Sequence, residues 1–198
     1  MRRRDFAKAW LALATADRRP FRDLFDGESL RHWTGDPALW TVQDGEIVGS
    51  TDRKKIRENS FLVSRETFRN FVFRVQAKLR NNNSGVQFRS TLHSGGVVQG
   101  YQADMGEDAY WGNIYEEKGS RGTLVDGWSG PGKKAAHLKG WNDLEIRCHG
   151  PEMSVILNGT VTATLRDTRW SSGLLGFQLH TGSAMEVRFR NPRILVLP

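Results

Sequence analysis

The sequence predicts an all-β protein, an antiparallel two-sheet sandwich or jelly roll. Apolar and polar residues alternate along much of the chain from residue 21 onward, and turn residues separate the alternating stretches at regular spacing. No convincing stretch with the 3.6-residue period of a helix follows the first 16 residues. At 198 residues the chain fits one domain, which we expect to span residues 17–198.

Individual strands follow from the alternation. The first clear one is residues 71–80 (FVFRVQAKLR), where apolar residues occupy every odd position. Residues 144–148 (LEIRC) repeat the pattern, as do residues 185–190 (MEVRFR) before a closing strand at 194–197. Each of these stretches is expected to bury one face and to expose the other.

Two tight turns are predicted from short sequence signals. Asn158-Gly159 separates the alternating stretches 153–157 and 161–165, and Asp44-Gly45 separates 41–42 from 47–48. Both pairs favour the two-residue loop of a β-hairpin. Residues 106–140 alternate weakly and contain eight glycines, so they are expected to form long loops at the rim of a sheet. Long loops in a compact domain usually serve a function.

Charge and composition exclude several classes of protein. The chain has 29 basic and 22 acidic residues, but the excess is scattered apart from the first eight residues and a short run at 53–57. A nucleic-acid-binding domain would gather that charge on one face, so no nucleic-acid partner is expected. No apolar run is long enough to span a membrane. Cys148 is the only cysteine, which excludes an intramolecular disulfide.

Residues 1–16 (MRRRDFAKAWLALATA) differ from the rest of the chain. A basic start precedes a short apolar stretch, and Ala14-Thr15-Ala16 fits a cleavage site. The paired arginines at 3–4 resemble a twin-arginine export signal, which favours a periplasmic or secreted protein. The alternative is a leader helix that packs on the domain or stays disordered.

Four strands carry an unusual set of polar residues on one side. Parity within each strand places these residues together: Gln87 with Arg89, Gln102 with Asp104, Tyr115 with Glu117, and Gln178 with His180. If the strands adjoin, one sheet face displays planar donors and acceptors that suit a hydroxyl-rich ligand, with Trp111 near enough to stack on a sugar ring. The alternative is a solvated sheet face without function. Weak alternation after residue 106 leaves Glu116 as the alternative to Glu117.

The sequence resembles the 3-keto-disaccharide hydrolase domain family, formerly a domain of unknown function, over about residues 20–197. The segments that carry the resemblance are FRDLFDGESL with Trp33, WTVQDGEIVGS, NNNSGVQFRS, GYQADMG, WGNIYEE, GWNDLEIRCHG, ILNGT, GLLGFQLHTG and FRNPRI. The resemblance implies a concanavalin A-like jelly roll, usually in exported bacterial proteins. It also implies a carbohydrate partner, namely a glycoside already oxidised to a ketone at C3.

The resemblance also implies a reaction in which the polar face would take part. A ketone at C3 acidifies the proton at C2, so a base can remove that proton and expel the substituent at C1, after which water adds back. Asp104, Glu117 and His180 are the candidates for proton transfer, and Arg89 and Gln102 are the candidates for holding the keto oxygen. Gln178, Tyr115 and Trp111 complete the expected binding surface. No cofactor is required by the sequence, and a divalent metal acting on the ketone stays open.

Two other functions remain open at this stage. The same fold occurs in non-catalytic carbohydrate-binding modules, and a structural or surface-interaction domain is the third possibility. Acidic, basic and histidine side chains clustered on one face favour an enzyme. Aromatic platforms with few titratable groups favour a lectin-like module.

Overall fold

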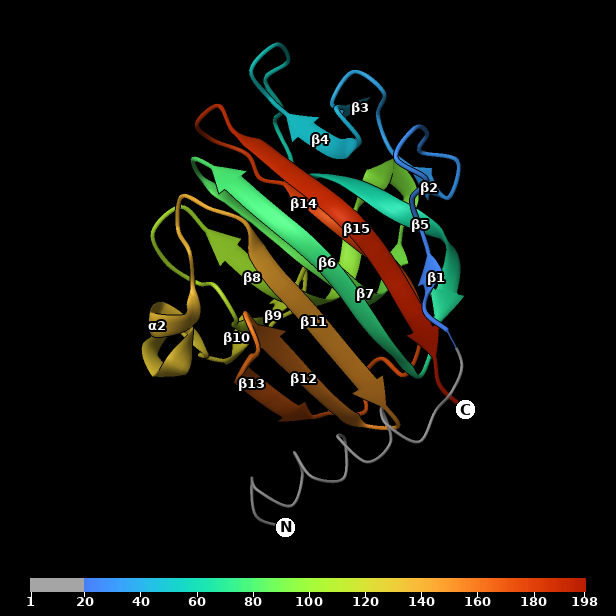
Figure 1. Cartoon of the computed structure of the whole chain (residues 1–198), viewed down its shortest axis with the longest axis vertical. Coiled ribbons are helices and arrows are strands. Elements are labelled where there is room, and N and C mark those ends of the chain that lie inside the picture. Colours follow the sequence, from blue (N-terminus) through green and yellow to red (C-terminus); the bar gives the residue numbers. More distant parts are fainter. Residues whose placement is uncertain (1–19) are drawn as a thin grey trace.

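Fifteen strands form two antiparallel sheets that pack face to face in the computed structural model, which describes residues 20–198 (Figure 1). The predicted all-β jelly roll is confirmed. The expected leader at residues 1–16 lies outside the described residues, so export stays a prediction. The helical segments of the described chain are all too short and too polar to cross a bilayer.

The first sheet has eight strands and is turned to the viewer in Figure 1. Its order is β13 (Thr160–Arg166), β12 (Glu152–Leu157), β11 (Asn142–His149), β6 (Phe71–Arg80), β15 (Glu186–Val196), β4 (Glu46–Ser50) and β3 (Trp40–Gln43), with β1 (Arg22–Asp23) paired to β15. Most of these strands were predicted from alternation.

The second sheet has seven strands and lies behind the first in Figure 1. Its order is β10 (Thr123–Val125), β9 (Ile114–Glu117), β8 (Val98–Gly106), β7 (Asn83–Leu92), β14 (Gly173–Leu179), β5 (Ser60–Phe68) and β2 (Trp33–Thr34). The four strands with the unusual polar residues are therefore neighbours, in the order β9, β8, β7 and β14.

Both predicted hairpins are present, with the backbone that their turn residues favour. Asn158 and Gly159 have φ angles of 48° and 78°, and Asp44 and Gly45 have φ angles of 52° and 73°. Two successive residues with positive φ match the right-handed twist of the flanking strands. These turns connect β12 to β13 and β3 to β4.

Apolar side chains from both sheets form the core between them. Phe177 of β14 stacks on Trp33 at a ring-centroid distance of 4.8 Å and on Phe189 of β15 at 3.8 Å, which joins the two sheets. Cys148 is fully buried, and burial raises the pKa of its thiol to about 12, so it is an inert core residue. Each buried large apolar side chain contributes about 1.5–3 kcal/mol to folding.

Residues 106–140 combine loops with a few short elements. They contain the short strands β9 and β10, a π-helical turn η2 (Trp128–Gly132) and one turn of helix α2 (Lys133–Ala135), while a 3₁₀ turn η1 (Ser94–Gly96) lies elsewhere. Figure 1 shows α2 at the edge of the molecule beside β10. The segment therefore lies at the sheet rim, as its weak alternation predicts.

Candidate functional site

A polar pocket lies on the outer face of the seven-stranded sheet, opposite the side that packs on the core. Strand register builds it: Gly176 of β14 pairs with Gln87 of β7, Gln87 with Gln102 of β8, Gln102 with Tyr115 of β9, and Tyr115 with Thr123 of β10. One row of residues thus crosses five strands, and alternation along each strand adds further polar residues on the same side.

The pocket has a volume of about 500 Å³. It is lined by polar and aromatic residues from both the strands and the adjoining loops: Asn59, Asn83, Gln102, Asp104, Tyr110, Tyr115, Glu117, Thr123, Gln178 and His180. That volume suits a small ligand such as a sugar. Six of the eight residues predicted for the site are therefore brought together, and the roles predicted for them stay predictions.

Asp104 is the most perturbed carboxyl group of the pocket. Its main-chain N–H donates to the Asn113 carbonyl at 3.2 Å, and its carbonyl accepts from the Gly112 N–H at 3.3 Å, which fixes the backbone. Burial raises the pKa of the Asp104 carboxyl to about 7; the hydrogen bond from Gln102 opposes this rise, and the negative charge of Glu117 adds to it. Asp104 therefore exchanges a proton readily near neutral pH.

Glu117 is the second carboxyl group. Gln178 Nε2 donates to Glu117 Oε2 at 3.0 Å, although β7 and β8 lie between the strands that carry them, so the sheet must curve toward this face. Burial raises the pKa of Glu117, while hydrogen bonds from Gln178 and Asn59 oppose the rise. The side-chain acceptor of Gln178, Oε1, is buried without a hydrogen-bond partner among residues 20–198.

A relay of side chains fixes one oxygen of Asp104. Ser90 Oγ donates to Gln87 Oε1 at 2.9 Å, Gln87 Nε2 donates to Gln102 Oε1, and Gln102 Nε2 donates to Asp104 Oδ1 at 2.7 Å. Gly85 makes room for the relay, because a Cβ atom there would lie 2.3 Å from Gln102 Cδ. This glycine therefore accommodates a neighbouring side chain.

His180 and Tyr115 complete the titratable set. The His180 ring lies with Nδ1 2.8 Å from the Thr181 carbonyl, so Nδ1 is the donor in this hydrogen bond. Asn82 Nδ2 donates to the Thr181 carbonyl at 3.0 Å and holds this turn. Burial raises the pKa of Tyr115, and the charges of Glu117 and Asp104 add to it, so its phenol stays a hydrogen-bond donor.

Two predicted residues do not reach the pocket, and Arg89 is the first. A β-bulge between Phe88 and Thr91 interrupts the pairing of β7 with β8, and Arg89 has a φ of 50°. The extra residue turns its side chain from the outer face into the interior. Its Nε and Nη2 donate to the Arg69 carbonyl at 3.0 and 2.6 Å, so the prediction that Arg89 holds the keto oxygen is wrong.

Trp111 is the second. Its side chain is completely buried in the core, and its Nε1 donates to the Gly106 carbonyl at 2.7 Å. It therefore presents no face to a ligand, and the prediction that it stacks on a sugar is wrong. Its neighbour Tyr110 lines the pocket.

On β9, Glu117 faces the pocket and Glu116 does not, as expected. Glu116 points to the opposite side, where it is fully buried in ion pairs with Arg121 at 2.6 Å and Arg169 at 3.0 Å. Arg121 also pairs with Asp167, which accepts from the Tyr101 hydroxyl. This network anchors the edge of the sheet and leaves Glu117 to the pocket.

Sequence reasoning missed four residues of the pocket lining: Asn59, Asn83, Tyr110 and Thr123. Asn59 and Tyr110 lie outside the regular strands, so no alternation marks them. The available signal for Tyr110 was its position in the predicted loop segment 106–140. Within the described part of the chain, no group of three or more His, Cys, Asp or Glu side chains is arranged to hold a metal ion.

A second hollow of about 520 Å³ lies on the outer face of the eight-stranded sheet. Its polar groups are largely paired with one another: Glu145 accepts from both Arg74 and Arg147, and Gln76 donates to Asp143 at 2.8 Å. The shifted carboxyl pKa values of Asp104 and Glu117 belong to the other hollow. The pocket on the seven-stranded sheet is therefore the stronger candidate for chemistry.

Comparison with known proteins agrees with this architecture. The family model described as the 3-keto-alpha-glucoside-1,2-lyase-like domain matches residues 20–195. No curated protein matches the chain. A protein from Parabacteroides distasonis ATCC 8503, provisionally assigned as a glycosyl hydrolase, is 20% identical with a TM-score of 0.66, over 90% of this chain and 100% of that one.

Two Bacillus subtilis structures are also similar in fold. Carbohydrate-binding module CBM66 is 18% identical with a TM-score of 0.59, over 87% of this chain and 98% of the module. A protein of unknown function with a galectin-like fold is 12% identical with a TM-score of 0.59, over 88% of this chain and 97% of that one. At these identities the solved structures support the jelly-roll fold alone.

Proposed function

Because the chain belongs to the 3-keto-alpha-glucoside-1,2-lyase-like domain family, we propose that its pocket binds a glycoside with a ketone at C3 and cleaves the bond between C1 and the leaving oxygen. The observation that carries this proposal is the pair of buried carboxyl groups, Asp104 and Glu117, whose pKa values are both raised. A site for binding alone gains nothing from two carboxyl groups that repel each other when ionised.

The reaction begins at C2. The Asp104 carboxylate takes the C2 proton, and the electron pair of that bond forms the enolate of the C3 ketone. With its Oδ1 held by Gln102, the Asp104 carboxylate has a fixed orientation toward this proton. A pKa of about 7 leaves both forms of Asp104 populated at neutral pH, so the group can accept the proton and later return it.

The enolate then expels the substituent at C1. The ketone reforms, a double bond forms between C1 and C2, and the bond from C1 to the leaving oxygen breaks. The Glu117 carboxyl, whose pKa burial raises, is the acid that supplies the proton to that oxygen, and Tyr115, which keeps its O–H, donates to the enolate oxygen. Hydration of the unsaturated product adds water oxygen at C1 and a proton at C2, which gives net hydrolysis.

The test uses p-nitrophenyl 3-keto-glucosides, prepared with either hydrogen or deuterium at C2. We expect the full chain to release p-nitrophenol and to do so more slowly from the deuterated substrate, because the C2 bond breaks in the reaction. Asp104→Asn should lower the rate about 100-fold or more, since it removes the base. Asp108→Asn, at an exposed position near the pocket, is the matched control and should keep the parent rate.

Each contrary outcome has a definite meaning. Release without an isotope effect and with full activity in Asp104→Asn contradicts elimination from C2 with Asp104 as the base. If the protein binds glycosides but releases p-nitrophenol from neither anomer, the result supports the alternative function, a non-catalytic carbohydrate-binding module.

A further inference from the structure

Tyr110 is an exposed aromatic side chain at the rim of the pocket. It lines the pocket and is 50% exposed. Among the exposed large hydrophobic side chains of residues 20–198 it is the only aromatic one. An exposed ring beside a polar pocket offers an apolar surface to a ligand, and the other tyrosine of the lining, Tyr115, is only partly exposed.

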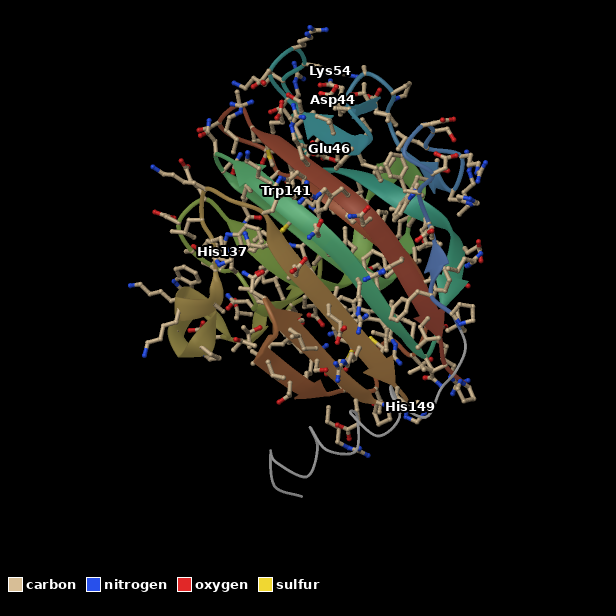
Figure 2. The ribbon with its side chains drawn as sticks, in the orientation of Figure 1. Asp44, Glu46, Lys54, His137, Trp141 and His149 are labelled. Atoms are coloured by element: carbon tan, nitrogen blue, oxygen red, sulfur yellow. The ribbon has the colours of Figure 1, made fainter. Side chains whose placement is uncertain are left out.

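The described tryptophans are engaged elsewhere. Trp33, Trp40 and Trp111 are buried in the core. Trp141, labelled in Figure 2 beside the eight-stranded sheet, is covered by Arg190, whose Cζ lies 4.1 Å from the ring centroid. Trp170 contacts Arg169 in the same way at 5.0 Å, and Trp128 packs against the core. With the tryptophans engaged and Tyr115 only partly exposed, Tyr110 is the most exposed aromatic ring at the pocket.

The turn that carries Tyr110 is held against β8, the strand that carries Asp104. Trp111 anchors it from below through its hydrogen bond to the Gly106 carbonyl at the end of β8. The Asn113 N–H donates to the Tyr110 carbonyl at 3.0 Å and closes the turn. The Tyr110 ring lies against Gly106, because a Cβ atom at that glycine would be 2.9 Å from Tyr110 Cδ2.

The backbone of Tyr110 is in an unfavourable conformation. Its φ is 68°, in the left-handed region that bulky residues rarely adopt. Such a conformation destabilises the folded state, and a side chain that is half exposed recovers little of this cost by burial. A strained exposed ring that is held by a buried tryptophan fits a role in binding better than a role in folding.

We propose that Tyr110 is the platform on which the apolar C–H face of the substrate's sugar ring stacks, and that Trp111 is the positioning residue that presents it. The ligand class is a pyranose whose hydroxyls meet the polar lining, such as Asn59, Asn83 and Thr123. The inference rests on the proposed function only in taking the ligand to be a glycoside.

The test compares Tyr110→Phe, which keeps the ring, with Tyr110→Asn, which removes it. Asparagine tolerates positive φ, so the turn should be retained. Calorimetry with unoxidised and 3-keto-glycosides should show Kd within about threefold of the parent for Phe, and at least tenfold weaker binding for Asn. In turnover, Tyr110→Asn should raise KM and leave kcat nearly unchanged, since uniform binding is lost. Leu92→Asn, an exposed apolar position that does not line the pocket, is the control and should have no effect.

Saturation-transfer NMR gives a readout that needs no turnover: sugar C–H protons should receive saturation from the aromatic ring in the parent and lose it in Tyr110→Asn. Trp111→Phe should weaken binding in the parent but add little in the Tyr110→Asn background, because it acts through the ring. Tyr110→Gly, which relieves the strain, replaces Tyr110→Asn if the latter unfolds.

Unchanged binding in the ring-deleted variants overturns the proposal. If the parent protein binds glycosides but cleaves none, the proposed function is contradicted, and the binding comparison still tests the role of Tyr110. A parent that binds no glycoside overturns both.

Discussion

At the scale of single residues, the pocket depends on carboxyl groups kept away from water. Asp104 is 6% exposed, and the nearby Glu117 has the same exposure. Burial penalises the ionised form of each group, and the negative charge of Glu117 further disfavours ionisation of Asp104. The result is a carboxyl group, Asp104, with a pKa of about 7, where ordinary aspartate is almost fully ionised.

This shift predicts how stability depends on pH. The folded protein holds the Asp104 proton up to about pH 7, whereas the unfolded chain releases it near pH 4. The contribution of Asp104 to the free energy of unfolding is therefore present at low pH and is lost as pH rises through 7. As pH rises from 4 to 8, we expect the Asp104→Asn variant to become more stable than the parent. The difference should reach up to about 4 kcal/mol, because each pKa unit corresponds to about 1.4 kcal/mol. Urea unfolding of both proteins at each pH measures the difference. Parallel stability curves would show that the Asp104 pKa is not raised.

At the scale of strands, small departures from regular pairing decide which side chains face the pocket. Gly85 on β7 pairs with Asp104 on β8, and the missing Cβ atom lets the Gln102 side chain lie across it. Further along β7, the bulge turns Arg89 inward and leaves Ser90 to begin the relay. One strand thus contributes both the space for the relay and its first donor.

Gly85→Ala should therefore impair the site more than the fold. The added methyl group would displace Gln102 and break its hydrogen bond to Asp104. We expect a loss of about tenfold or more in kcat/KM and a stability loss of about 1–3 kcal/mol, typical of overpacking. Gly130→Ala is the matched control, because nothing lies within 4 Å of the added atom. Equal activity in both variants would show that the relay is dispensable.

At the scale of the whole molecule, Arg89 ties together segments that are distant in sequence. Its guanidinium group reaches from β7 to the Arg69 carbonyl, in the turn where the chain passes from β5 of one sheet to β6 of the other. The side chain is fully buried, and its Nη1 has no hydrogen-bond partner among the described residues. A buried cation of this kind costs desolvation energy, so its hydrogen bonds to the crossover matter.

Arg89→Ala should lower stability without removing a pocket residue. We expect a loss of about 2–4 kcal/mol, because it leaves the Arg69 carbonyl unpaired and opens a cavity. The folded fraction should keep a kcat close to that of the parent. Thermal unfolding and turnover per folded molecule measure the two effects, and Arg53→Ala, at an exposed position, is the control. A large drop in kcat with unchanged stability would instead favour a role at the reacting oxygen.

The sequence alone determined the features that depend on local contacts. Alternation with a period of two follows from strand geometry, so it identified β6 and β11 and placed Gln102 and Asp104 on the outer face. It predicted the single strand β15 as two strands, and it left Glu116 as the alternative to Glu117. The hairpins at Asn158-Gly159 and Asp44-Gly45 could also be predicted from the sequence, because their turn type depends on residues that tolerate positive φ.

Only the tertiary structure decided what depends on distant parts of the chain. A bulge shows no signal in alternation, since it is set by pairing with the neighbouring strand, and so Arg89 was placed on the wrong side. Which of Tyr110 and Trp111 faces the pocket depends on a turn closed against the end of β8. The contact between Gln178 and Glu117 spans two intervening strands and exists only because the sheet curves. Parity is a local property, whereas curvature, bulges and loop anchoring arise from packing of the whole domain.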